Sequence, residues 1–187
     1  SGSVTSGNVG SGKSVTLGTL ALANGTGSAS NYSLSSVSFE ISQRPLTLTA
    51  SKVYDGATSI QGSDITTFTN IVGSETLVVT GSGSVSSANV GTGKSVTLGS
   101  LALANNTGLS GNYSISSVSA SITQRPINLS GSRTYDATRT ANGSDFSLAN
   151  LVTGETLNIS GSGTLGSPAA GTQTVVNTNT LALANGS

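Results

Sequence analysis

The chain has 187 residues, in which seven basic and seven acidic side chains cancel, and it contains no Cys, His, Met or Trp. This balance argues against a nucleic-acid partner, because such a surface needs clustered Lys and Arg. Without Cys and His, disulfides, thiolate nucleophiles and the commonest general base are also missing. No apolar run approaches the length of a membrane span, so this segment is not expected to insert into a membrane.

Residues 1–43 show apolar side chains that alternate with a period of two, which indicates half-buried strands. Val15 and Leu17 belong to one such series. A second series begins at Tyr32 and shifts by one residue at Ser35-Ser36, as a β-bulge or a change of sheet requires. The cluster Gly10-Ser11-Gly12 predicts a turn before the first series.

Residues 44–124 continue the alternation, with Leu46 and Leu48 in one strand and Leu77 and Val79 in another. Gly- and Asn-rich clusters between the apolar runs predict turns every 8–12 residues, about the spacing typical of β-sandwiches. No stretch shows the 3.6-residue apolar period of a helix. We therefore expect an all-β fold.

The whole chain repeats with a period of 81 residues: Tyr54-Asp55 returns as Tyr135-Asp136, and Gln43-Arg44-Pro45 as Gln124-Arg125-Pro126. A fixed period of this length indicates an array of similar units. The copies predict three parts: the later half of a unit in 1–43, a complete unit in 44–124, and an incomplete unit lacking its final strand in 125–187.

The expected architecture is a row of tandem Ig-like antiparallel β-sandwich units of about 81 residues in an elongated array. Pro45 and Pro126 lack an N–H group and bias the preceding Arg toward extended geometry, which predicts a short extended junction at each. A β-solenoid is the alternative fold, less favoured because 81 residues is long for one coil.

One stretch, Gly7 to Ser14, satisfies the phosphate-loop pattern G-x-x-x-x-G-K-S. A true phosphate loop joins a buried strand to a helix, whereas Val15 and Leu17 here alternate like a strand. Lys13 has a counterpart in Lys94 but none in the third copy, which has Gln173 in this region. A residue lost from one copy is a poor candidate for nucleotide binding or for an isopeptide crosslink in each unit.

The few carboxylates recur from copy to copy, so they are interpreted as turn and capping residues rather than as catalytic groups. Asp55 returns as Asp136, and Asp64 returns as Asp145. We expect no catalytic residue and no cofactor. Calcium could be held by such turns, but no D-x-D-x-D spacing is present.

Four tyrosines occupy two positions of the unit, Tyr32 with Tyr113 and Tyr54 with Tyr135. The simpler interpretation is core packing, with the hydroxyl bonded to a nearby backbone group. The alternative is an aromatic platform for sugars. Absence of Trp weakens that alternative.

Together the motifs Val53-Tyr54-Asp55-Gly56, Asn89 to Lys94, Gly111 to Ser114 and Ile122 to Pro126 resemble the YDG/MBG repeats. These are glycine-rich, mostly-β modules found in tandem in bacterial filamentous-haemagglutinin-like adhesins. The resemblance covers essentially the whole chain and implies export to the extracellular bacterial surface. Ala137 stands where Gly56 stands, which predicts a turn that does not need positive φ.

The repeat and the resemblance lead to the expectation of a non-catalytic stalk or spacer segment of a large surface adhesin or extracellular matrix fibre. Its expected partners are the neighbouring repeats of the same chain. The alternative is a multivalent module in which each repeat binds host or matrix glycans. A third expectation is head-to-tail self-association, in which another chain's N-terminal segment fills the place of the missing strand in 125–187.

Overall fold

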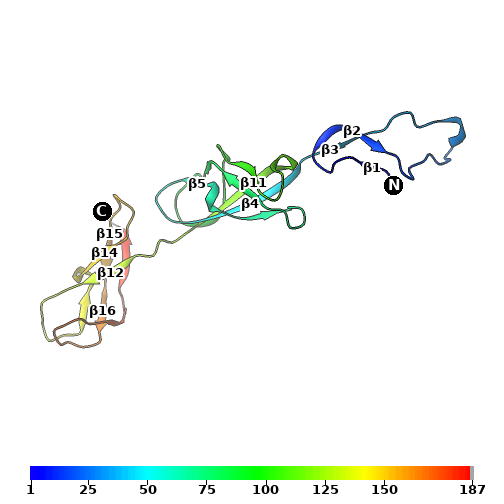
Figure 1. Ribbon diagram of the computed structural model, residues 1–187. Coiled ribbons are helices and arrows are strands. Elements are labelled where there is room, and N and C mark those ends of the chain that lie inside the picture. Colours follow the sequence, from blue (N-terminus) through cyan, green and yellow to red (C-terminus); the bar gives the residue numbers. More distant parts are fainter. Residues whose placement is uncertain (186–187) are drawn as a thin grey trace. The chain divides into compact units, whose positions relative to one another are not determined.

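The structure, a computed structural model, describes residues 1–185, which form short β-strands and single 3-10 turns with no α-helix among them (Figure 1). The all-β expectation is therefore confirmed for these residues. The chain divides into two compact units, the first comprising Ser1–Lys52 with Ala57–Thr123 and the second comprising Val53–Gly56 with Gln124–Ser187. Each unit is described by itself below.

At the start of the first unit, three strands form one small sheet in the order β1-β2-β3. They are β1 (Ser3–Val4), β2 (Gly10–Thr16) and β3 (Ser38–Ile41). The prediction of a turn at Gly10-Ser11-Gly12 is wrong. These residues lie within β2, and the β2–β3 register shifts between Gly10 and Lys13. Gly12, at φ 64°, supplies the left-handed residue that such an irregularity uses.

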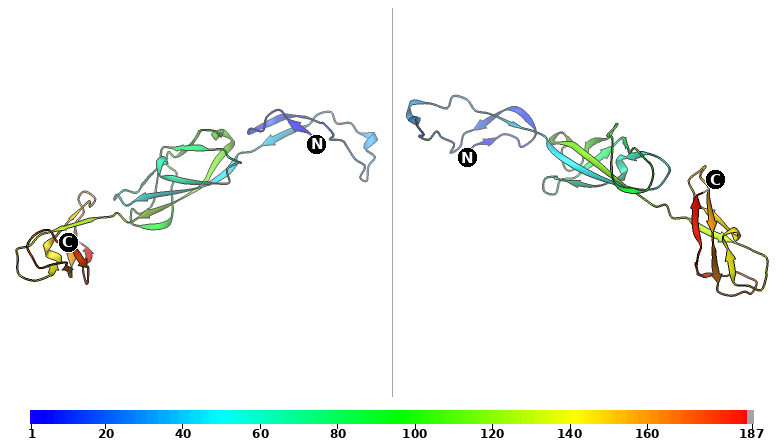
Figure 2. Two further views of the ribbon diagram at one scale, coloured as in Figure 1. Left: turned by 60° about the horizontal axis from the view of Figure 1, so that its bottom comes forward. Right: turned by 180° about the vertical axis from the view of Figure 1, so that it is seen from behind.

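Residues 44–124, called the complete repeat below, contain a four-stranded sheet in the order β6-β4-β11-β9. Its strands are β4 (Arg44–Val53), β6 (Ile65–Thr69), β9 (Gly91–Ser95) and β11 (Tyr113–Thr123). Two antiparallel pairs accompany it: β5 (Ser59–Gln61) with β8 (Ser82–Ser84), and β7 (Leu77–Thr80) with β10 (Ala102–Asn105). The adjacent β4 and β11, in cyan and green, stay side by side in the further views of Figure 2.

The main hydrophobic core lies in this repeat and joins strands that are distant in the sequence. Leu46 and Leu48 of β4 are fully buried and pack with Leu77 of β7 and Tyr113 of β11. Burial along β11 changes phase between Tyr113 and Val118, which confirms the shift predicted at the equivalent Ser35-Ser36. Burial of these large side chains is the main source of stability for such a unit.

The strands of the second unit pair as their counterparts do in the complete repeat. The pairs β12–β14, β13–β16, β16–β17 and β15–β18 are antiparallel. The strands are β12 (Asn128–Gly131), β13 (Thr140–Asn142), β14 (Phe146–Ala149), β15 (Leu157–Ser160), β16 (Ser162–Leu165), β17 (Val175–Asn177) and β18 (Ala182–Asn185). Antiparallel pairing disfavours the solenoid alternative, since β-helical coils pair in parallel.

Side chains of residues 44–124 differ sharply in burial from their counterparts in residues 1–43 and 125–187. Leu48 is 0% exposed and its counterpart Leu129 is 44% exposed, while Tyr113 is 3% exposed and Tyr32 is 70% exposed. Residues 1–43 hold no counterpart of β4 or β7, the strands that cover Tyr113. The expectation that Tyr32 packs in a core is therefore wrong for this chain.

Candidate functional site

The Arg of each Gln-Arg-Pro motif binds an Asn in a left-handed conformation. In the first unit, Arg44 Nε donates to the Asn70 carbonyl oxygen and an Arg44 terminal nitrogen to Asn70 Oδ1, both at 2.6 Å. Asn70 Nδ2 in turn donates to the Pro45 carbonyl oxygen at 2.9 Å. Asn70 has φ 76°, a conformation that Asn tolerates better than most residues. The pair therefore fixes the start of β4 to the end of β6.

The same arrangement recurs in the second unit with nearly the same geometry. Arg125 Nε donates to the Asn150 carbonyl oxygen at 2.6 Å, and an Arg125 terminal nitrogen to Asn150 Oδ1 at 2.8 Å. Asn150, at φ 71°, returns a bond of 2.8 Å to the Pro126 carbonyl oxygen. From the sequence, the two Gln-Arg-Pro motifs were interpreted only through their prolines, as extended junctions, and the Arg–Asn pair was missed. The signal for it was an Asn at nearly the same offset, 25 or 26 residues, from each Arg.

The Tyr-Asp loop, which follows Tyr54-Asp55 in one copy and Tyr135-Asp136 in the other, is bonded to a basic side chain three residues before the Asp. Lys52 Nζ donates to the carbonyl oxygens of Ala57 and Ser59, both at 2.9 Å. Its counterpart Arg133 donates to the Thr138 carbonyl oxygen at 2.7 Å and pairs with Asp136. An ionised Glu or an apolar side chain could not supply such a donor.

Asp136 closes its own turn by accepting bonds from the Thr138 backbone N–H and hydroxyl, both at 2.9 Å. Ala137 between them has φ 61°, and the equivalent Gly56 has φ 77°. The prediction that Ala137 would avoid positive φ is wrong. The bonds to Asp136 hold this residue in the left-handed region at a steric cost that Gly56 does not carry.

We expect the carboxyl of Asp136 to titrate well below an ordinary aspartate. The Arg133 side chain and the Thr138 backbone N–H and hydroxyl lower its pKa to about 2. Since the folded pKa is depressed, the contribution of this ion pair to stability is full above pH 3.8 and is lost as the pH falls through about 2. A pH series of carboxyl carbon chemical shifts measures this directly. A midpoint near the ordinary value would contradict the bonding described.

The tyrosines are placed differently in the two units. Tyr113, buried, donates its hydroxyl to the Glu75 carboxylate and accepts from the Val72 backbone N–H at 3.3 Å. The bond to Glu75 raises the pKa of Tyr113. In the second unit, Tyr54 donates to Glu155, the counterpart of Glu75, and this bond raises the pKa of Tyr54. Tyr135 is 64% exposed.

Two further aspartates cap short 3-10 turns, as the sequence predicted for the recurring carboxylates. Asp64 accepts from the Gln61 backbone N–H, and Asp145 accepts from the Asn142 backbone N–H, both at 2.8 Å. They end the turns η2 (Gly62–Asp64) and η4 (Gly143–Asp145). These carboxylates therefore serve as acceptors for backbone N–H groups.

The stretch that matches a phosphate loop does not have that fold. Lys13 lies inside β2 and Lys94 inside β9, so each is flanked by a strand where a phosphate loop would have a helix. Without a helix N-terminus, the converging N–H groups that hold phosphate are missing. The expectation that each Lys is followed by a strand and not by a helix is confirmed.

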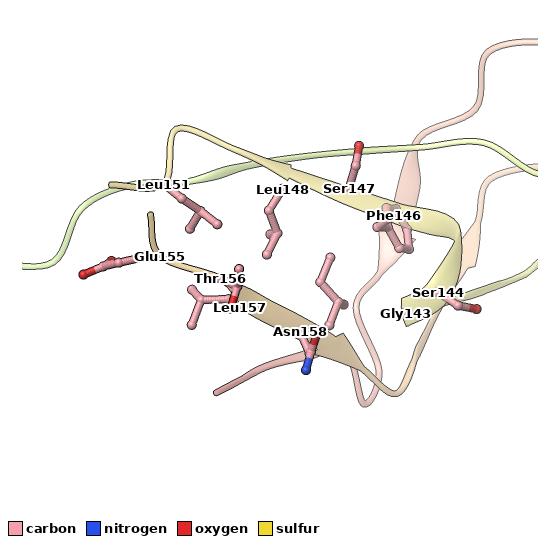
Figure 3. Close-up of a pocket in the computed structure, with 11 residues that line it drawn as sticks. Gly143, Ser144, Phe146, Ser147, Leu148, Leu151, Glu155, Thr156, Leu157 and Asn158 are labelled. Carbon is pink, nitrogen blue, oxygen red and sulfur yellow. The ribbon is translucent and has the colours of Figure 1, made fainter. Parts of the chain in front are cut away.

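An open cavity of about 540 Å³ lies in the second unit between β14 and β15 (Figure 3). Leu148 and Leu151 point into it, and Leu157 and Ile159 of β15 also line it. Leu157 and Ile159 are the counterparts of Leu77 and Val79, which are 6% and 7% exposed in the complete repeat. The cavity therefore lies on the surface that is closed in the complete repeat by the core around Tyr113.

A second hollow of about 750 Å³ in the same unit is lined by residues of the Tyr-Asp loop and of the segment before β17, including Arg133, Tyr135 and Gln173. Within residues 1–185 there is no group of three or more acidic, His or Cys side chains that could hold a metal ion. Over the same residues, no helix has the length and apolarity needed to cross a membrane.

These features define a class: an all-β tandem-repeat protein whose recurring polar side chains hold the turns and strand ends of each repeat. The particular family follows from comparison with known families. The YDG domain matches residues 42–122 and again residues 121–187, and the chain belongs to this family as two tandem repeats. The chain matches no curated protein and no solved structure.

Proposed function

We propose that this chain is a non-catalytic spacer segment in the stalk of a bacterial surface adhesin or extracellular fibre. One observation carries the proposal. The polar side chains that recur with the repeat are engaged in its own architecture: Arg44 and Arg125 with left-handed Asn residues, and Asp64 and Asp145 with 3-10 turns. Residues kept for a reaction would be expected to converge on a shared site, whereas these are distributed along each unit.

The mechanical design of the proposed spacer is a row of small sandwich-like units. The core of the complete repeat joins β4 and β11 to β7, which is consistent with one sheet packing on another as in Ig-like sandwiches. Equal numbers of acidic and basic residues and a low charged fraction of 7% leave a neutral polar surface. Such a surface suits a spacer that keeps clear of charged partners.

Two measurements test this role and its location. Antibodies against the chain should label intact, unpermeabilised cells that produce the parent protein, and labelling only after permeabilisation would contradict a surface location. Small-angle X-ray scattering should give an elongated particle. A compact particle would contradict a spacer.

Glycan binding is the alternative function, and the exposed aromatic rings of Tyr32 and Tyr135 favour it. A glycan array probed with the chain separates the two proposals. A blank array supports the spacer. Binding that disappears in Tyr32→Ala or Tyr135→Ala, with the fold retained, supports the glycan module.

Self-association is a further proposal, supported by the open cavity lined by Leu148, Leu151 and Leu157. The exposed Tyr32 of a second copy is the counterpart of Tyr113, which closes the equivalent core in the complete repeat. Sedimentation at rising protein concentration should show dimers that Tyr32→Ala weakens. A strict monomer at high concentration would rule this partner out.

A further inference from the structure

Two turns that belong to different repeats meet inside the first unit. The Val9 backbone N–H donates to Asn112 Oδ1 at 2.8 Å, and Asn112 Nδ2 donates to Asn8 Oδ1 at 2.9 Å. A backbone N–H can only donate, so this contact fixes the orientation of the Asn112 amide and leaves its NH2 group facing Asn8. The Asn112 side chain thus bonds both to the backbone of Val9 and to the side chain of Asn8.

A third bond comes from the junction itself. Gln43 Nε2 donates to the Gly111 carbonyl oxygen at 3.2 Å, beside Asn112. The receiving turn, η3 (Ser110–Asn112), is ordered by its own bonds, with Ser110 N–H on Asn105 Oδ1 at 2.7 Å and Asn112 N–H on the Leu109 carbonyl oxygen at 3.0 Å. It therefore meets the Asn8-Val9 turn without having to be reshaped.

Both turns of this contact, the Asn-Val turn and the Asn-Tyr turn, occur a second time in the chain with similar local hydrogen bonds. Asn89 N–H is bonded to Ser87 Oγ at 3.2 Å, as Asn8 N–H is to Ser6 Oγ at 3.2 Å. Asn31 N–H is bonded to the Ser28 carbonyl oxygen at 3.1 Å, in the turn equivalent to η3. Yet Asn31 is exposed while Asn112 is half-buried, and Val90 is 50% exposed while Val9 is half-buried.

We propose that the Asn-Val turn of one repeat, together with the Gln of the following junction, is a docking surface for the Asn-Tyr turn of the next repeat. This docking rests on the proposed spacer role, and the partner of each repeat is the repeat that follows it. The stretch that imitates a phosphate loop thus serves a protein contact. Asn89 and Val90, both in the first unit, form a second copy of the Asn-Val turn, and its occupant is the Asn-Tyr turn of another YDG repeat. Residues 125–187 contain no Asn-Tyr pair.

The third copy of the Asn-Val turn has lost a side-chain acceptor, so we expect it to bind more weakly. Ala169 and Ala170 stand in place of Asn8 and Val9, and Ala169 N–H keeps the bond to Ser167 Oγ at 3.1 Å. The Ala170 backbone can still donate, but the side-chain acceptor is gone. This turn is therefore a weaker docking surface than the other two.

Amide hydrogen exchange of the full chain, read by NMR, tests the docking surface. Asn112→Ala removes the acceptor of the Val9 N–H, and loss of one hydrogen bond should speed exchange at Val9 by about fivefold. Asn31→Ala, the matched control, should leave Val9 unchanged. Equal effects of the two variants, or no effect of Asn112→Ala, would overturn the proposal.

A second pair of variants keeps the test decisive if Asn112→Ala does not fold. Asn8→Ala removes only the acceptor of the Asn112 NH2 group and should speed exchange at Val9, whereas Asn89→Ala should not. An Asn8→Ala effect no larger than that of Asn89→Ala would overturn the docking surface. Exchange in the isolated chain is independent of cellular location, so this failure is distinct from failure of the spacer role.

Discussion

Leu48→Ala should lower the free energy of unfolding of the complete repeat by about 2–5 kcal/mol, measured by urea denaturation. Leu48 is 0% exposed and packs in the cluster that holds Leu46, Leu77 and Tyr113. Truncating it removes apolar contacts and leaves a cavity that the surrounding strands cannot fully close. A unit of about 81 residues has little stability in reserve, so the loss amounts to a large part of the total.

The chain supplies its own control for this substitution. Leu129 is the counterpart of Leu48 one repeat later but is 44% exposed. Leu129→Ala should therefore cost clearly less, about 1 kcal/mol or below. Equal losses for the two variants would mean that the segments 44–124 and 125–187 are equally packed in solution, against the burial described.

Tyr113→Phe should destabilise the complete repeat by about 1–3 kcal/mol, because it leaves the Glu75 carboxylate without its hydroxyl donor. Tyr113 is 3% exposed, and its ring stays in place in the variant. The matched control is Tyr32→Phe, whose ring is 70% exposed and whose substitution should be nearly neutral. Thermal or urea unfolding of both variants measures the difference, and a Tyr32→Phe loss as large as that of Tyr113→Phe would contradict it.

The same bond gives the complete repeat a sensitivity to alkaline pH. Because Glu75 raises the pKa of Tyr113 above 10.0, the bond's contribution is full below pH 10.0 and is lost as the pH rises through the folded pKa. The stability of the unmodified chain should fall in this alkaline range more steeply than that of Tyr113→Phe. Parallel pH profiles of the two would contradict the Tyr113–Glu75 bond.

Features that depend on local pattern could be predicted from the sequence. The period-two alternation gave the strands that carry Leu46, Leu48, Leu77 and Val79, and the shift at Ser35-Ser36 anticipated the change of burial phase in β11. Motifs such as Val53-Tyr54-Asp55-Gly56 indicated the YDG family, which the comparison confirms. The turn-capping role of Asp64 was also within reach, since a carboxylate in a Gly-rich turn has few other partners.

Features that depend on non-local contacts could not be predicted in this way. The Arg44–Asn70 pair joins residues 26 apart through a backbone conformation that no local rule specifies. Ala137 adopts positive φ because Asp136 holds the turn, a tertiary effect that overrides residue preference. The exposure of Tyr32 depends on which strands accompany it, and its sequence neighbourhood closely resembles that of Tyr113.

Single-molecule force spectroscopy on the full chain, pulled from its two ends, tests most directly whether residues 44–124 form a self-contained mechanical unit. The core around Leu48 and the Tyr113–Glu75 bond predict one discrete unfolding step for that repeat. Its gain in contour length should approach, from below, about 290 Å, the extended length of 81 residues. A smooth extension without a step, or a single step that releases the whole chain at once, would contradict a spacer built from separate repeats.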